Sequence, residues 1–244
     1  MHANLDGRLR AVADFVKQGA RIADIGTDHA RVPLALLRAG KVTFAVAVDK
    51  NRGPYRAALR AAQATSIGER LSIRLGDGLS PLLPAEVDTL ILAGMGGTLC
   101  IAILEAGKEV LHAAQQVILQ PMTDIPEVRR WLYMQGWHLE DEALAKADGK
   151  LYVVLSAVQG KHPLPNPLQL EIGPCLWERR PPLFMMHVEK IFHAWQKAAQ
   201  GMAQSTRMRG SEEHQNILAK LQALQEAFAG KYKTKIKRKK ECSK

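Results

Sequence analysis

The spacing of apolar residues predicts two parts of the chain with different secondary structure. Up to about residue 158, short apolar runs alternate with segments in which apolar residues recur every three or four positions. This alternation is typical of a parallel sheet covered by helices. Beyond residue 168 only the helical spacing continues. We therefore expect an α/β fold followed by a helical part.

The first part is expected to hold five strands and a closing antiparallel hairpin. The strands are predicted at residues 20–24, 44–48, 71–75, 89–92 and 117–119. Helices are predicted at residues 5–16, 33–39, 55–64, 98–105 and 126–135. Asp148-Gly149 separates two further β-rich runs, residues 137–147 and 150–158, and this pair is typical of a tight hairpin turn.

The helical part is predicted to be a hairpin. Three prolines between residues 160 and 167 indicate a boundary, which divides the chain into domains 1–160 and 161–230. Ser211 can cap the second helix. We expect the apolar stripes of the two helices to pack against each other. The stripes are Val188, Ile191, Phe192, Trp195, Ala199 and Met202, then Ile217, Leu221, Leu224 and Phe228.

Composition changes this picture little. The 244 residues are 47% hydrophobic, enough for a full core, and no apolar stretch approaches the roughly 18 residues that would span a membrane. The start of the chain shows no export signal, and the three cysteines lack metal-ligand spacing. We expect a cytoplasmic protein without a bound metal.

The charge is concentrated at one end. Of the net charge of +10, residues 231–244 carry +7, so the other 230 residues carry +3. Such a tail favours a polyanion because each neutralised phosphate releases counterions. The alternative is a flexible tail that only keeps the protein soluble. The tail residues predicted to bind RNA are Lys231, Lys233, Lys235, Lys237, Arg238, Lys239 and Lys240.

Polar residues or glycines follow five predicted strands in succession. Because ligands of open parallel sheets bind outside the carboxyl ends of the strands, this series predicts a binding site. The residues are Asp24, Gly26, Asp28 and His29, then Asp49 and Lys50, then Gly76, Asp77 and Gly78, then Gly94 and Gly96 with their apolar neighbours Ala93 and Met95, and finally Gln120.

The chemistry of these residues favours an adenosyl ligand. Gly26 allows close approach of the backbone, and Asp49, 25 residues after Asp24, can accept hydrogen bonds from both ribose hydroxyls. Asp77 can accept from the adenine amine. Asp28 stands where a dinucleotide site has its second glycine, and its carboxylate would repel a pyrophosphate. The amino group or sulfonium of S-adenosylmethionine would be attracted to it.

Five motifs resemble those of the bacterial tRNA (adenine-22-N1)-methyltransferase family. They cover roughly residues 5–158, and the hairpin turn Asp148-Gly149-Lys150 matches too. The resemblance implies a Rossmann-like class I methyltransferase fold, a C-terminal coiled-coil domain, and methylation of N1 of an adenine in tRNA. The motifs are Asp24-Ile-Gly-Thr-Asp-His-Ala30, Gly76-Asp-Gly-Leu79, Ala93-Gly-Met-Gly-Gly97, Ile103-Leu-Glu-Ala-Gly107 and Leu119-Gln-Pro121.

The resemblance also implies residue roles. Asp24, Gly26, Asp28 and His29 would surround the methionine part of the cofactor. Asp49 would bind the ribose, Asp77 and Gly78 the adenine, and residues 94–97 would separate the cofactor from the target base. This chain departs from the family at Met122, where the family usually has Asn, and at Arg31, where it usually has Tyr. Both positions are expected near the target base or its backbone.

Asp28, His29 and Gln120 are predicted to lie nearest the chemistry. Asp28 can accept from the cofactor amino group or from the N6 amine of the target, or it can cap the next helix. His29 is either a site residue or a packed histidine, and Gln120 would supply orientation. Two other functions fit the same sequence: methylation of another RNA or a small molecule, and RNA binding without catalysis. The oligomeric state is not predicted.

Overall fold

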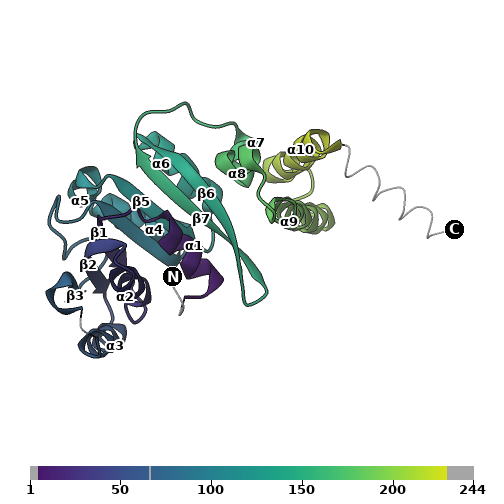
Figure 1. The fold of residues 1–244 in the computed structure, drawn as a ribbon. Helices are drawn as coiled ribbons and strands as arrows, with labels where there is room; N and C mark the ends of the chain where they lie inside the picture. Colours follow the sequence, from purple (N-terminus) through teal and green to yellow (C-terminus); the bar gives the residue numbers. More distant parts are fainter. Residues whose placement is uncertain (1–4, 66, 230–244) are drawn as a thin grey trace.

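The computed structural model describes residues 5–65 and 67–229 and holds a seven-stranded sheet. Its strand order is β3-β2-β1-β4-β5-β7-β6. Strands β1 to β5 are parallel, whereas β7 and β6 run antiparallel at one edge (Figure 1). The strands are β1 (Ala20–Ile25), β2 (Val42–Asp49), β3 (Leu71–Leu75), β4 (Thr89–Met95), β5 (Gln116–Pro121), β6 (Trp137–Ala147) and β7 (Lys150–Gln159). This order confirms the predicted class I methyltransferase sheet.

Helices cover both faces of the sheet because the central strands are apolar on both sides. Within β1, Ile22 joins one core and its neighbour Ala23 the other. Helices α1 (Gly7–Phe15), α2 (Arg31–Arg38) and α3 (Arg52–Gln63) pack on the first face. Helices α4 (Gly97–Ala106), α5 (Lys108–Ala113) and α6 (Ile125–Met134) pack on the second.

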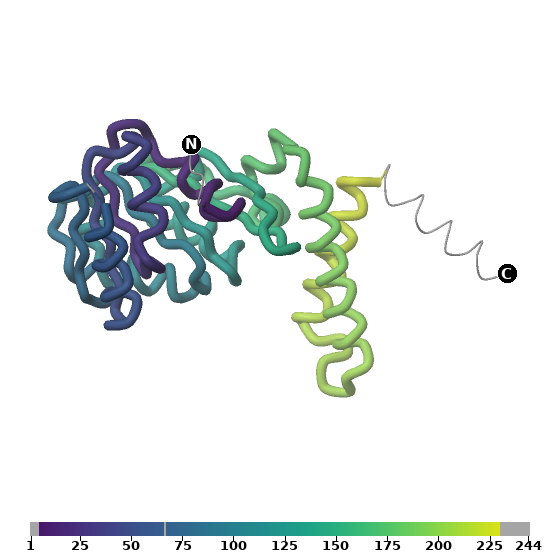
Figure 2. The backbone as a smooth tube through the Cα atoms, turned by 60° about the horizontal axis from the view of Figure 1, so that its bottom comes forward, coloured from purple at the N-terminus to yellow at the C-terminus, as the bar shows by residue number. Residues whose placement is uncertain are grey.

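Within the described residues, four helices follow the sheet. After residues 160–166, which form no regular structure, come α7 (Pro167–Ile172), α8 (Pro174–Arg179), α9 (Phe184–Gln204) and α10 (Glu212–Ala227). Figure 2 shows the long helices α9 and α10 side by side, projecting away from the sheet. The hairpin and its Ser211 cap are confirmed, since the Ser211 side chain accepts a hydrogen bond from the His214 amide.

The apolar core is continuous between the sheet and these helices. Phe184 and Val188 of α9 and Leu224 of α10 belong to the same buried cluster as Leu155 of β7. The boundary predicted at residue 160 therefore falls in an irregular segment, but packing crosses it. The predicted tail, residues 231–244, lies outside the described residues.

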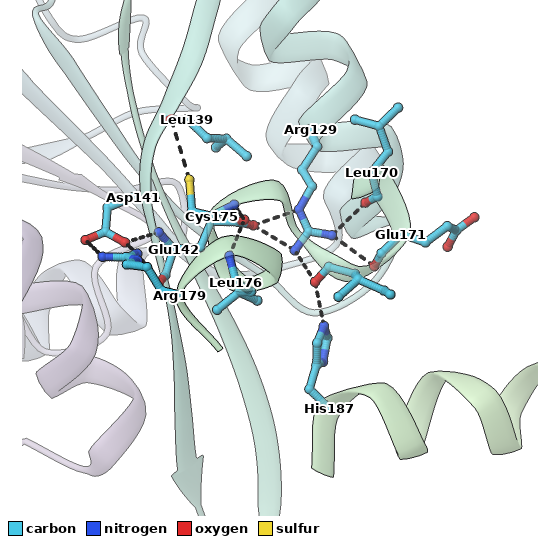
Figure 3. Close-up of polar contacts among 11 residues, drawn as sticks. Arg129, Leu139, Asp141, Glu142, Leu170, Glu171, Cys175, Leu176, Arg179 and His187 are labelled. Carbon is cyan, nitrogen blue, oxygen red and sulfur yellow. Dashed lines mark hydrogen bonds and ion pairs between the residues drawn. The ribbon is translucent and has the colours of Figure 1, made fainter. Parts of the chain in front are cut away.

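A buried ion pair connects the sheet to helices α7 and α8 (Figure 3). Arg129 of α6 donates from Nε to Glu142 of β6 at 2.8 Å, and both side chains are fully buried. The remaining guanidinium nitrogens donate to the carbonyls of Leu170, Glu171 and Ile172 at 2.7, 3.1 and 3.4 Å. These carbonyls end α7, so Arg129 satisfies groups that the helix leaves unpaired.

The second carboxylate oxygen of Glu142 is also hydrogen-bonded. Its Oε2 accepts from the amides of Cys175 and Leu176 at the start of α8, at 2.9 and 3.4 Å. His187 of α9 lies 2.8 Å from the Ile172 carbonyl, and burial lowers the pKa of this histidine to about 4. It is therefore neutral near pH 7, and Nε2 carries the proton that it donates. The network joins α6, α7, α8, α9 and β6.

Candidate functional site

Two adjoining cavities lie at the carboxyl edge of the parallel strands, where the strand order reverses between β1 and β4. The first cavity has a volume of about 230 Å³ and lies over β2, β3 and β4. The second has about 240 Å³ and lies over β1, β4 and α1. Both are lined by Gly26, which follows β1. Gly26 is therefore the residue at which the two cavities meet.

The first cavity collects the residues predicted to hold ribose and adenine. Asp49, Lys50 and the segment 76–78 line it, together with Met95. Asp49 is 8% exposed, and its Oδ1 accepts a hydrogen bond from the Asn51 amide at 2.8 Å, which fixes the carboxylate. Gly78 has φ +56°, a conformation that favours glycine.

Gly26 lies between the two cavities and has no side chain of its own. Its φ is +71°, and the Met95 methyl group lies where a Cβ on residue 26 would stand. A side chain at position 26 would therefore collide with Met95 in addition to adopting a strained backbone.

The second cavity brings charges of both signs together. Asp24, Asp28, Arg8 and Arg31 line it, with the backbone of residues 93 and 94. Asp24 is 6% exposed, and its Oδ2 accepts from the Thr27 hydroxyl at 2.6 Å.

Burial raises the pKa of Asp24 to about 7, and its neighbours modify this effect. The Thr27 hydrogen bond opposes it, whereas the carboxylates of Asp28 and Asp49 add to it. A cation entering the second cavity would favour the ionised form of Asp24.

Asp28 and His29 are exposed at the rim. Their side chains are 75% and 60% exposed, and His29 Nε2 lies 3.3 Å from Asp28 Oδ1. The packed interpretation of His29 is therefore wrong. The capping interpretation of Asp28 is also wrong, because α2 begins at Arg31 with Ala30 as its N-cap and no side-chain cap hydrogen bond. His29 does not line either cavity but sits with φ +57° in the turn before α2.

Arg8 is a site residue that the sequence reasoning missed. It projects from α1 into the second cavity, where Nη1 donates to Gln120 Oε1 at 2.8 Å and lies next to Gly94. Gln120 is fully buried, and its Nε2 donates to the Pro121 carbonyl at 3.2 Å. Gln120 thus lies behind Arg8 and orients it.

The remaining predicted residues lie apart from these cavities. Gly96 is the N-cap of α4 and lines neither cavity. Met122 is 48% exposed and lies in a third cavity beside α9. The basic residues 231–240 lie outside the described ranges. Within residues 5–65 and 67–229, no group of three or more metal-binding side chains could hold an ion, and no helix is long and apolar enough to cross a membrane.

Comparison with known proteins agrees with this geometry. The family model described as "Methyltransferase domain" matches residues 5–155. The tRNA (adenine(22)-N(1))-methyltransferase of Bacillus subtilis is 40% identical over 156 residues, which are 64% of this chain and 66% of the relative. By this alignment the chain spans just under two thirds of that relative's length.

Solved structures match over nearly the whole described chain. The crystal structure of the Bacillus subtilis M1A22 tRNA methyltransferase has a TM-score of 0.79 and 31% identity, and the match covers 93% of this chain and 96% of that one. The Streptococcus pneumoniae protein Sp1610 in complex with S-adenosyl-L-methionine has a TM-score of 0.77 and 34% identity, over 90% and 97% of the two chains. The chain therefore belongs to the methyltransferase domain family and, within it, to the bacterial tRNA (adenine(22)-N(1))-methyltransferases.

Proposed function

We propose that this chain transfers a methyl group from S-adenosylmethionine to N1 of an adenine in tRNA, at a position of the 22 type, in the cytoplasm. The observation that carries the proposal is the pair of cavities joined at Gly26. The first cavity has carboxylates that can accept hydrogen bonds from ribose hydroxyls and from the adenine amine. The second cavity has side chains of both charge signs. This matches an adenosine linked to a zwitterionic amino acid.

The residues of the chain fit such a ligand at each part. Asp49 would accept from the ribose hydroxyls, and Asp77 with Gly76 and Gly78 would border the adenine. Asp24 and Asp28 would accept from the amino group.

Four further positions complete the proposed cofactor site. Arg8 is placed to pair with the carboxylate. Lys50 lies at the ribose side, and Ala93 and Gly94 line the second cavity.

S-adenosylmethionine supplies a methyl group on a positively charged sulfur, and the acceptor nitrogen must come within about 3 to 3.5 Å of that carbon. N1 of an unpaired adenine has a free lone pair, so no strong general base is needed. His29, beside Asp28 at the exposed rim, would face the target base, and Gln120 would act through Arg8 as a positioning residue. A carboxylate near the N6 amine would stabilise the charge that develops on the ring.

The remaining assignments are proposals of the same kind. Residues 1–160 would form the catalytic domain and 161–230 the helical domain. Arg31, which lines the second cavity, and the basic residues of the tail would contact the RNA.

Labelled S-adenosylmethionine and total tRNA, with and without ribonuclease, test this function. We expect label in the tRNA that ribonuclease releases, and N1-methyladenosine on nucleoside analysis. Cofactor binding without any transfer would instead support an RNA-binding relative without catalysis. Transfer that resists ribonuclease and labels small molecules would indicate a different acceptor.

A further inference from the structure

The third cavity, with a volume of about 410 Å³, is not used by the cofactor site. It is a groove between three segments: the loop after β5, the start of β7, and helix α9. These contribute residues 121–126, 150–153 and 187–195. The groove therefore lies where the sheet meets the helical hairpin.

The surface of the groove is apolar and aromatic. Met122 is 48% exposed, a large fraction for a methionine side chain, and Tyr152 and Trp195 line the groove from β7 and α9. All three side chains offer flat or polarisable surfaces rather than branched aliphatic ones. Such surfaces suit a planar base, because stacking on an aromatic ring needs no particular base identity.

Two lysines supply positive charge at the same groove. Lys150 starts β7, and Lys190 of α9 donates to the Leu151 carbonyl at 3.2 Å, which holds its ammonium group at the groove. Two acids also line it, but both are engaged. Asp124 accepts from Thr98 and Thr123, and Glu171 pairs with Lys220.

The groove adjoins the proposed active site. The Met122 amide donates to the carbonyl of Met95, which lines the first cavity, at 2.7 Å. The guanidinium of Arg8, which lines the second cavity, lies 5.8 Å from the centre of the Tyr152 ring. An RNA chain that presents its target base at the rim of the second cavity would therefore pass its next nucleotide over Tyr152 and Met122.

We propose that the groove binds an unpaired nucleotide adjacent to the target adenine, with its base against Tyr152 and Met122 and its phosphate at Lys150 and Lys190. This inference rests on the proposed function, since it requires an RNA substrate. It specifies that recognition extends to a neighbouring nucleotide, which must leave its stack together with the target. It also gives a role to Met122, whose polarisable side chain can contact the neighbouring base.

Point variants test the two parts of the groove separately. Tyr152→Leu removes the ring and should lower kcat/KM for tRNA roughly tenfold, whereas Tyr152→Phe keeps the ring and should stay within about twofold. Lys150→Ala with Lys190→Ala should raise the KM for tRNA and reduce its salt dependence. Lys108→Ala is the matched control, since it removes an exposed lysine at the start of α5. The dissociation constant for S-adenosylmethionine and the melting temperature should not change in any of these variants.

A substrate change identifies the occupant. The experiment uses tRNA transcripts with an abasic site immediately before or after the target adenine. It compares how well the wild type and Tyr152→Leu methylate each transcript. One of the two transcripts should be a poorer substrate for the wild type, and Tyr152→Leu should add little to that loss. Full additivity for both transcripts, or no loss with either, would overturn the groove proposal. Absence of any methylation of intact tRNA by the wild type would instead refute the proposed function.

Discussion

At the residue scale, Asp24 combines deep burial with a position facing a cavity. Burial raises its pKa to about 7 from an ordinary value of 3.8. At a pH between these two pKa values, the folded protein holds a proton on Asp24 that the unfolded chain has released. The folded state therefore binds more protons, so this residue makes the protein less stable as the pH rises from about 4 to about 7.

Replacing the carboxyl group tests this linkage. Asp24→Asn should gain stability relative to the wild type across that pH range, by up to about 4 kcal/mol at pH 7 and above. Urea unfolding between pH 4 and 8 in the absence of cofactor measures the difference. Asp77→Asn removes an exposed carboxylate from the same edge and serves as the control. A stability difference between Asp24→Asn and wild type that is constant with pH would contradict the assignment.

Asp28 is the second residue with a testable role. Asp28→Ala should abolish methyl transfer, a loss of at least about a hundredfold, because a rim carboxylate would be missing. The fold should be unaffected, since this side chain is 75% exposed and caps no helix.

A tritium-transfer assay with tRNA, together with a melting curve, measures both effects of Asp28→Ala. Asp28→Asn keeps the shape and should recover little activity if the charge is what matters. Retained transfer in the alanine variant would remove Asp28 from the site.

At the scale of elements, the Arg129–Glu142 network holds the short helices against the sheet. Removing one member of a fully buried ion pair leaves the other charge uncompensated, so Arg129→Met should cost about 3–5 kcal/mol in the free energy of unfolding. Arg179→Met removes a half-exposed guanidinium paired with Asp141 and should cost less than about 1 kcal/mol.

Urea unfolding of both arginine variants makes the comparison direct. A double variant, Arg129→Met with Glu142→Leu, should recover part of the loss, because it leaves no unpaired charge in the core. If Arg129→Met and Arg179→Met cost the same, the buried network does not hold the two parts together.

This network also explains what the sequence could not reveal. Strand β3 was predicted at its observed bounds, because the alternating segment Leu71-Ser-Ile-Arg-Leu75 ends at a glycine. Helices α5, α7 and α8 were missed: each has only six residues, too short for a helical period to show. The ends of α7 and α8 are satisfied by Arg129 and Glu142, which are remote in sequence.

The candidate site also contains both kinds of residue: those that the neighbouring sequence reveals and those that only long-range contacts in the fold reveal. The strand-end residues Asp24, Asp49 and Asp77 could be found because each lies within two residues of the end of a predicted strand. Arg8 could not, because its contact with Gln120 joins residues 112 positions apart and no local motif marks it. The groove under Tyr152 depends likewise on how α9 packs against the hairpin, a placement that periodicity alone does not specify.

At the scale of the whole molecule, charge is separated from the catalytic fold. Residues 231–244 carry +7, and the rest of the chain only +3. The second cavity sets the carboxylates of Asp24 and Asp28 against the guanidinium groups of Arg8 and Arg31, so most of the attraction of a tRNA has to come from elsewhere on the molecule. The proposed function uses the tail and Arg31 as its positive charges, and the groove adds Lys150 and Lys190.

Deleting residues 231–244 separates attraction from catalysis. The slope of log affinity against log salt should fall by about 0.9 for each phosphate that the tail neutralises, so the truncated chain should bind tRNA more weakly and with a flatter salt dependence. Its dissociation constant for S-adenosylmethionine should be unchanged, because the cavities are built from residues 8–103. Filter binding from about 50 to 300 mM salt measures the slope.

A variant of full length with Lys237, Arg238, Lys239 and Lys240 changed to Gln separates the effect of the tail's charge from the effect of its length. If affinity and slope both stay at wild-type values, the tail only keeps the protein soluble, and Arg31 and the groove lysines must account for the attraction of the RNA.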